Sequence, residues 1–259
     1  MTTVTKLVDY HASDGVARIT LSDGDRGNPI SAALGRQLLG AVRRAHADSA
    51  RVIVLAARGR YFSVGGDLAA LHAAAAPGAF MDDLTSDLHR VVVELMESDA
   101  VVVSAVQGHA AGAGFPLACA ADIVLAARTA SFSLAYARVG LSPDGGSTLL
   151  TRSLGLHTVL RLALLGQQLT AQEALDAGLV AQLVPADRLA DTVEGIVATL
   201  LDGSTEALSA TKAVIRGTAS EHVESVLRRE ALAIRRLAGT DDGREGVRAF
   251  LEKRSPSFG

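Results

Sequence analysis

The chain has 259 residues, of which 49% are hydrophobic and 20% charged, and its formal net charge is −3 at pH 7. This composition fits one large domain, or a core domain with an appendage, and excludes a disordered chain. There is no tryptophan, few aromatic residues and no block of like charge, which argues against nucleic acid or a membrane as a partner.

The single cysteine, Cys119, excludes an intrachain disulfide and a zinc site built from several cysteines. It lies among alanines of an expected helix, which favours a buried, inert thiol over a nucleophile. Residues 1–15 show no basic stretch followed by an apolar one, and no run reaches the roughly 18 apolar residues of a membrane span. We therefore expect a soluble, cytoplasmic protein.

The first half of the chain alternates strand and helix signals. VARITL (16–21) predicts a strand, and Ser31 is placed to N-cap a helix that runs to about Asp48. RVIVLAA (51–57) is a continuous apolar run, typical of a strand covered on both faces. The next expected elements are a glycine loop that opens an alanine-rich helix (61–71), a break at Pro77-Gly78 and a helix at about 81–97. A strand (101–106), a second glycine loop with a short helix, and strands at 123–126 and around Phe132 follow.

Beyond the turn at 141–146 the chain is expected to be mostly helical. Thr170 and Glu173 form a capping box, and Gly178 is placed to end that helix. Helical spacing continues over 187–201, 204–216 and 221–238, and Thr240 starts a last helix. Strands thus dominate the first half and helices the second, and no internal repeat or linker is evident.

The glycine loop after the strand 101–106 invites comparison with nucleotide-binding motifs. Gly112 and Gly114 match the first two glycines of a dinucleotide fingerprint, but Leu117 occupies the third position. The acidic residue expected about 20 positions later is missing, because Asp122 comes too early. There is no P-loop, and the nearest match to the G-x-S-x-G serine motif, GLSPD (140–144), lacks its second glycine.

The histidines show no spacing typical of a metal site, and we expect His89 and His109 to be packing or surface residues. The loops VGGD and GAGF each follow an apolar strand and open a helix. If the fold brings them together, one N–H from each could bind a single developing oxyanion. The alternative is that their glycines only make tight turns and allow close packing, and spacing alone favours this alternative.

Five segments in order resemble the crotonase (enoyl-CoA hydratase/isomerase) superfamily, over nearly the whole chain. They are YFSVGGDL, VQGHAAGAGFPLACAADI, ASFSLAYARVGLSPDGGSTLLTRSLG, ALLGQQLTAQEALDAGLV and REGVRAFLEKRSPSF. Within the superfamily, the turn at LSPD and the final segment resemble most the subgroup of 1,2-epoxyphenylacetyl-CoA isomerases of phenylacetate degradation.

The resemblance implies an α/β fold, a spiral of ββα units followed by a C-terminal helical trimerisation region. We place the core with the acyl-CoA site at 1–200 and the helical region at 201–259. The implied partner is an acyl-CoA thioester, with coenzyme A entering as part of the substrate and no separate cofactor or metal. The implied assembly is a homotrimer or a dimer of trimers. The implied oxyanion hole consists of the backbone N–H groups of Gly66 and Ala113.

The sequence departs from the family pattern where hydratases carry two catalytic glutamates. Pro116 and Tyr136 occupy these positions, and neither is a suitable base at neutral pH. Asp144 matches the position at which isomerases and dehalogenases of the superfamily carry an acidic residue. In the isomerases this residue acts as a base, and in the dehalogenases it acts as a nucleophile. Without the resemblance, an aspartate before Gly-Gly reads as a helix N-cap.

The resemblance therefore predicts an isomerase in which Asp144 moves a proton while the oxyanion hole holds an enolate. The candidate residues for the acyl pocket are Phe115, Pro116, Leu117, Phe132, Leu134 and Tyr136. We expect Asp67 to cap a helix, and Arg26, Lys253 and Arg254 are candidates for contacts with coenzyme A. The alternatives are a hydratase of low or altered activity, a dehalogenase or thioester hydrolase with Asp144 as nucleophile, and a non-catalytic CoA-ester-binding protein.

Overall fold

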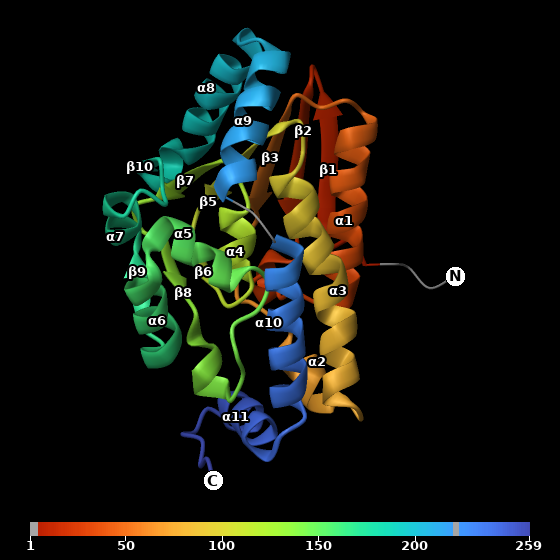
Figure 1. Ribbon diagram of the computed structural model, residues 1–259, viewed down its shortest axis with the longest axis vertical. Helices are drawn as coiled ribbons and strands as arrows, with labels where there is room; N and C mark the ends of the chain where they lie inside the picture. The colour runs from red at the N-terminus through yellow and green to blue at the C-terminus, as the bar shows by residue number, and fades with distance from the viewer. Residues whose placement is uncertain (1–4, 220–222) are drawn as a thin grey trace.

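Consecutive strands of this chain alternate between two sheets. The computed structural model describes residues 5–219 and 223–259. After the hairpin β1-β2, each of the pairs β3-β4, β5-β6 and β7-β8 gives its first strand to a six-stranded sheet and its second to a four-stranded one (Figure 1). The strands are β1 (Val8–Ser13), β2 (Val16–Leu21), β3 (Val52–Ala57), β4 (Tyr61–Ser63), β5 (Val101–Val106), β6 (His109–Ala111), β7 (Ile123–Ala127), β8 (Ser131–Ser133), β9 (Gln168–Thr170) and β10 (Gln182–Val184).

The large sheet has the order β1-β2-β3-β5-β7-β10, and the small sheet the order β4-β6-β8-β9. Only β1 and β9 run antiparallel to their neighbours. The parallel connections contain the helices, so the chain forms the expected α/β spiral of ββα units although its sequence shows no repeat. The carboxyl ends of β4, β6 and β8 consequently lie side by side at one edge of the small sheet.

Eleven α-helices and four short 3₁₀ turns accompany the strands in the described residues (Figure 1). The helices are α1 (Ala32–Ala47), α2 (Leu68–Ala73), α3 (Pro77–Met96), α4 (Gly114–Cys119), α5 (Thr151–Leu154), α6 (Leu156–Leu165), α7 (Ala171–Asp176), α8 (Leu189–Asp202), α9 (Thr205–Ala219), α10 (Val223–Ala238) and α11 (Asp241–Leu251). The 3₁₀ turns are η1 (Gly24–Arg26), η2 (Ala135–Val139), η3 (Ser147–Leu150) and η4 (Ala186–Arg188). None of the described helices is long and apolar enough to cross a bilayer.

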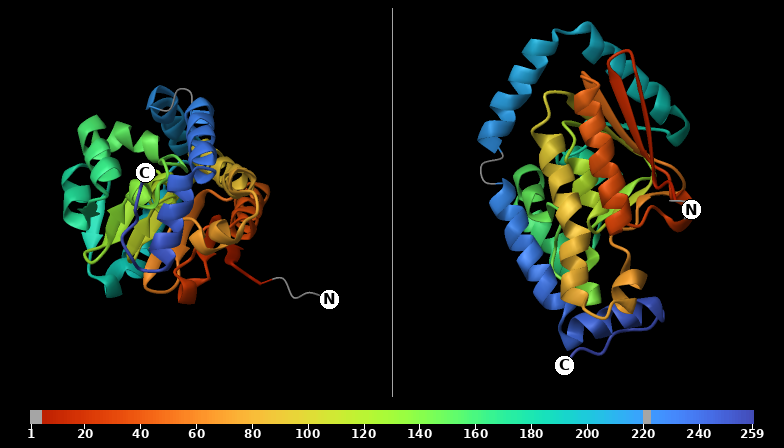
Figure 2. Two further views of the ribbon diagram at one scale, coloured as in Figure 1. Left: turned by 90° about the horizontal axis from the view of Figure 1, so that it is seen from below. Right: turned by 90° about the vertical axis from the view of Figure 1, so that its right-hand side faces the viewer.

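Helices cover both faces of the large sheet. Along β3, Ile53 and Leu55 enter the main core beneath α1 and α3, whereas Val52 and Val54 join a smaller core beneath α8. In the right-hand view of Figure 2 the first strands lie between α1 and α8. The prediction that the apolar run 51–57 is a strand covered on both faces is therefore confirmed.

The helix boundaries follow mostly local signals. Ser31 accepts the N–H of Leu34, and Thr170 with Glu173 makes the complete capping box, as predicted. One boundary was wrong: α3 begins at Pro77 instead of about residue 81, because proline is well tolerated in the first turn of a helix. The predicted helix at 221–238 is present from Val223, and its first two positions lie outside the described residues.

The C-terminal helices are part of the main body. Figure 1 shows α10 alongside α3, and α11 lies against α2 at the lower end of the molecule. From α9, the buried Lys212 donates to the carbonyl oxygens of Leu95 and Ala100 and pairs with Asp122 at 2.9 Å. Burial lowers the pKa of this lysine. These contacts fix α9 to the end of α3 and to the residues that precede β5 and β7.

Candidate active site

The two glycine loops meet at the carboxyl ends of β4 and β6. The backbones approach so closely that a Cβ on Gly65 would lie 2.9 Å from the carbonyl oxygen of Ala111. A Cβ on Gly112 would lie 3.6 Å from the Cα of Gly65. Because Gly65 and Gly112 also have positive φ angles, of 87° and 51°, both positions suit glycine. The sequence spacing left open whether the two glycine loops meet, and the fold brings them together.

The backbone N–H groups of Gly66 and Ala113 are free of partners within the described residues. Gly66 forms a parallel bridge with Ile30, in which Ile30 donates to Gly65 and Asp67 donates to Ile30. The N–H of Gly66 itself therefore points away from Ile30. Ala113 precedes the first turn of α4, where N–H groups lack partners within the helix. Both residues line the same cavity.

This cavity has a volume of about 360 Å³ and a mainly apolar wall. Its large apolar side chains come from the β4–α3 region, the η2 loop and the C-terminal helices: Val64, Leu68, Leu71, Met81, Leu84, Val139, Leu141, Ile234 and Phe250. Its polar side chains are those of Asp67, His109, Ser133, Tyr136, Arg138, Asp144 and Gln168. The combination suits an apolar ligand that is oriented by a few polar groups.

Asp144 is the buried carboxylate of the cavity wall, with 2% of its surface exposed. Its main-chain carbonyl accepts hydrogen bonds from the Tyr136 hydroxyl at 2.9 Å and the Ser147 hydroxyl at 2.6 Å. Its side chain caps no helix, because the turn η3 starts after Gly146 and has no side-chain cap from Asp144. The N-cap interpretation of Asp144 is therefore wrong.

The side-chain partner of Asp144 is His89 on α3. The Nε2 atom of His89 lies 3.0 Å from Oδ1 of Asp144, and the imidazole is 13% exposed. His89, which we expected to be a packing or surface residue, is therefore in contact with the candidate carboxylate. Sequence reasoning missed it because the two residues are 55 positions apart and no local pattern connects them.

Glu230 on α10 accepts hydrogen bonds from the backbone N–H groups of the turn that follows Asp144. One carboxylate oxygen accepts the N–H of Gly146 at 2.7 Å, and the other accepts the N–H and the hydroxyl of Thr148 at 2.7 and 2.5 Å. Burial raises the pKa of Glu230, and the charge of Asp144 acts in the same direction. The only sequence signal was an acidic residue on the apolar stripe of α10, between Leu227 and Ile234.

His89, Asp144 and Glu230 offer ligand atoms that lie within 4.8 Å of one another. As a metal site this group is poor, because both oxygens of Glu230 already accept short hydrogen bonds. The 3.0 Å contact between His89 and Asp144 also has the length of a hydrogen bond. The arrangement therefore suits a hydrogen-bonded carboxylate better than a metal ligand set.

Comparison with known proteins identifies the family. A profile described as Enoyl-CoA hydratase/isomerase matches residues 11–259. The chain belongs to this family. An Escherichia coli protein named 1,2-epoxyphenylacetyl-CoA isomerase is 37% identical over 255 residues, 96% of each chain. A Rhodobacter capsulatus protein named "Probable enoyl-CoA hydratase" is 36% identical over 253 residues, 97% of each chain. The crystal structure of an enoyl-CoA hydratase from Mycobacterium avium subsp. paratuberculosis K-10 matches with a TM-score of 0.89 and 32% identity, over 98% of this chain and 99% of that one.

In this enoyl-CoA hydratase/isomerase family member, four residues expected on the acyl pocket lie elsewhere. They are Phe115, Leu117, Phe132 and Leu134, all with no exposed surface, and none is on the cavity wall. The rings of Phe115 and Phe132 pack at a centroid distance of 4.9 Å. The short helix α4 and strand β8 direct these side chains into the core, so their apolar character reflects packing.

The two positions at which the resemblance implies glutamates in hydratases, Pro116 and Tyr136, lie in different parts of the structure. Tyr136 lies on the cavity wall, where burial and then the charge of Asp144 raise its pKa well above the usual value. Pro116 lies outside the cavity, in a separate hollow beside Cys119. Neither side chain can supply a carboxylate to a bound thioester.

His109 lies on the cavity wall, but both ring nitrogens are engaged. Nδ1 contacts the hydroxyl of Ser131 at 2.8 Å, and Nε2 contacts that of Ser133 at 3.1 Å. Burial lowers the pKa of the imidazole. This geometry supports the expected packing role for His109.

The basic residues proposed for coenzyme A lie at the surface. Arg26 pairs with Asp23 at 3.3 Å and with Asp67 at 3.1 Å. Asp67 also accepts the N–H of Ala70, which confirms it as the cap of α2. Lys253 is exposed and is not on the cavity wall, whereas Arg26 contacts Asp67, which is on that wall.

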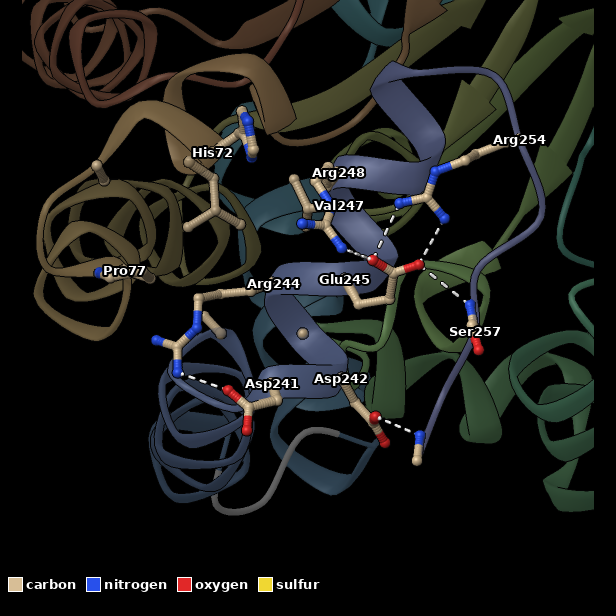
Figure 3. A pocket seen from close by; sticks show the side chains of 15 residues that line it. His72, Pro77, Asp241, Asp242, Arg244, Glu245, Val247, Arg248, Arg254 and Ser257 are labelled. Atoms are coloured by element: carbon tan, nitrogen blue, oxygen red, sulfur yellow. Dashed lines mark hydrogen bonds and ion pairs between the residues drawn. The ribbon is translucent and has the colours of Figure 1, made fainter.

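A larger hollow of about 750 Å³ lies between α2, α11 and the C-terminal tail (Figure 3). Its charged side chains neutralise one another: Glu245 binds Arg248 and Arg254 and accepts the N–H of Ser257. These hydrogen bonds, led by those of the arginines, lower the pKa of Glu245. The hollow contains neither glycine loop nor Asp144, so its size does not make it the candidate site.

Proposed function

We propose that this protein is an acyl-CoA isomerase that shifts a double bond, or rearranges a ring epoxide, through a thioester enolate. The observation that carries the proposal is the placement of Asp144 on one cavity wall with Gly66 and Ala113. This supports a site with one proton-transferring group and two N–H donors. The Escherichia coli relative named 1,2-epoxyphenylacetyl-CoA isomerase adds support for this type of reaction.

In the proposed mechanism, the thioester oxygen accepts hydrogen bonds from the N–H groups of Gly66 and Ala113. Asp144 removes a proton from an adjacent carbon, the C–H electron pair delocalises onto the oxygen, and an enolate forms. The same carboxyl group then returns the proton to another carbon of the conjugated system. A preorganised donor typically contributes about 3 to 4 kcal/mol to such a step.

Hydration needs a second acid–base group to activate water. The cavity wall offers Tyr136 where family hydratases have a glutamate, and its hydroxyl donates to the Asp144 carbonyl. Asp67 is the other carboxylate on the wall, and it is engaged by Ala70 and Arg26. A single available carboxylate is sufficient for isomerisation, because no water is added.

The decisive experiment is incubation with a panel of unsaturated acyl-CoA esters in D₂O. We expect double-bond migration without water addition, with deuterium incorporated to the extent that the proton on Asp144 exchanges with D₂O before its return, detected by mass spectrometry and NMR. Asp144→Asn should lower this rate by about 10²- to 10⁴-fold, the usual contribution of an acid–base group. Asp83→Asn, which alters an exposed aspartate of α3, is the matched control and should keep the wild-type rate.

Other outcomes support the alternatives. Hydrated products identify a hydratase, and a covalent acyl-enzyme on Asp144 identifies a nucleophilic hydrolase or dehalogenase. Tight binding of CoA esters without exchange at the α-carbon identifies a non-catalytic binding protein. An Asp144→Asn variant that isomerises at the wild-type rate removes the proposal.

We also propose the assembly implied by the resemblance, a homotrimer or a dimer of trimers. The supporting observation is a stripe on α6, where Leu156, Leu160 and Leu164 are 58%, 41% and 69% exposed. Their spacing of four residues places them along one side of the helix. An exposed apolar stripe of this kind is typical of a protein–protein contact.

A further inference from the structure

We propose that His89 is a positioning residue, whose Nε2–H donates to Oδ1 of Asp144 and thereby directs the other carboxylate oxygen, Oδ2, into the cavity. The inference deepens the proposed isomerase function and rests on it. It begins from the 3.0 Å contact between the two side chains.

His89 contacts Asp144 from outside the cavity. It is on α3 and is not part of the cavity wall, whereas Asp144 is. A bound thioester in the cavity would therefore meet Asp144 and not the imidazole. Any effect of His89 on the reaction passes through the carboxylate.

The second oxygen of Asp144 is available to a substrate. No described residue donates a hydrogen bond to Oδ2, and this atom is not among the buried polar atoms that lack a partner. The main chain of Asp144 is already held by Tyr136 and Ser147. The side chain can still rotate about its Cα–Cβ and Cβ–Cγ bonds, and the second of these torsions is broad and roughly two-fold. The hydrogen bond to His89 restricts that rotation.

The hydrogen bond is compatible with both forms of Asp144. As a carboxylate, Asp144 accepts the Nε2 proton at Oδ1. When Oδ2 takes a proton from the substrate carbon, the C–H bond breaks, an O–H bond forms, and Oδ1 remains an acceptor. Return of the proton reverses these changes at another carbon. The imidazole therefore keeps its own proton throughout the shift.

Two substitutions of His89 distinguish a role in positioning Asp144 from a role in exchanging a proton with it. Gln has an amide N–H at about the reach of Nε2, whereas Leu has similar bulk and no donor. We expect His89→Leu to lower kcat by about 10- to 100-fold with little change in KM, because a misdirected carboxylate costs rate more than binding. We expect His89→Gln to restore kcat to within about 3-fold of the wild type, since one donor replaces another.

The results that overturn the inference are specific. Wild-type kcat in both variants means that the hydrogen bond has no effect, and an equal loss in both means that His89 acts through its charge or its proton. Asp144→Asn is measured in parallel. If that variant isomerises normally, the proposed function fails, whereas an inactive Asp144→Asn with a fully active His89→Leu defeats only this inference.

A measurement on the wild-type protein covers the case in which His89→Leu fails to fold. In ¹⁵N-histidine NMR spectra, we expect His89 to show a protonated Nε2 whose shift changes in Asp144→Asn. An unprotonated Nε2 overturns the inference without any variant of His89. Thermal melting and titration with a CoA ester confirm that each variant is folded and binds.

Discussion

The carboxylate of Asp144 meets His89 across 55 positions of sequence, and Glu230 reaches the following turn across 84 and 82. Neither partner could be predicted, because pairs so distant depend on how α3 and α10 pack. Asp144, Gly66 and Ala113 were predicted, because short motifs carry them, and the cavity brings them together. Phe115 and Leu117 were misplaced, because apolar residues suit a pocket wall and a core equally well.

His109 gives a pH-dependent prediction. Burial lowers its folded-state pKa below the ordinary value of 6.5, so the unfolded chain binds a proton more readily. The stability that neutral His109 provides is present above pH 6.5 and is lost as the pH falls below it. His109→Gln should cost about 1 kcal/mol at pH 7, through its hydroxyl contacts, and less at acidic pH.

Urea unfolding of both proteins between pH 5 and 7.5 measures the difference. The wild type should lose stability faster than His109→Gln as the pH is lowered. Parallel curves for the two proteins would contradict the assignment of a half-buried, neutral imidazole.

Local signals predicted most of the helices and the strands β2, β3, β5, β7 and β8. They missed β1, and they missed β4, β6, β9 and β10, which have three residues each and are too short to show an alternating pattern. Ser31, Thr170 and Thr240 cap α1, α7 and α11 as predicted, because a cap depends on residues within one turn. The start of α3 was predicted wrongly, because proline is compatible both with a break and with the first turn of a helix. Whether the glycine loops touch could not be read at this level, because it depends on the pairing of β4 with β6.

The close packing of α4 on β4 gives a second prediction. A Cβ on Gly114 would lie 2.6 Å from the Cβ of Ser63, which forces the helix and the strand apart. Gly114→Ala should therefore cost about 1 to 3 kcal/mol of stability. It should also lower the isomerisation rate, because Ala113 and Gly66 move relative to one another.

Gly195→Ala is the matched control, since a Cβ there meets nothing within 4 Å in the helix α8. This control should gain about 0.5 to 1 kcal/mol. Urea unfolding and deuterium exchange measure both effects. Equal stability changes in the two variants would show that α4 can shift without cost.

Across the molecule, the two sheets and the C-terminal helices converge on one cavity. The large sheet supports α3, the small sheet supplies both glycine loops, and α10 supplies Glu230. The α/β class was predicted from the resemblance to the family, whereas the sequence pattern alone indicated only strands in the first half and helices in the second. The strand order could not be predicted, because strands of similar composition can pair in many ways.

The exposed stripe of α6 gives a prediction about assembly. We expect light scattering to give three or six times the protomer mass. Leu160→Glu combined with Leu164→Glu should shift the protein toward the protomer, because charge on the stripe opposes apolar contact. Ala190→Glu, on the exposed side of α8, should leave the mass unchanged. A wild-type protein of protomer mass would contradict the proposed assembly.

By itself, the sequence determined most of the helices, the longer apolar strands, the predicted caps and the motifs that resemble the family, because these depend on residues that are close along the chain. Only the tertiary structure decided that Gly66 and Ala113 face one cavity and that His89 and Glu230 hold the segment of Asp144. Hydrogen bonds between distant residues leave no periodic trace in the sequence, and a carboxylate acquires its orientation only from the groups packed around it.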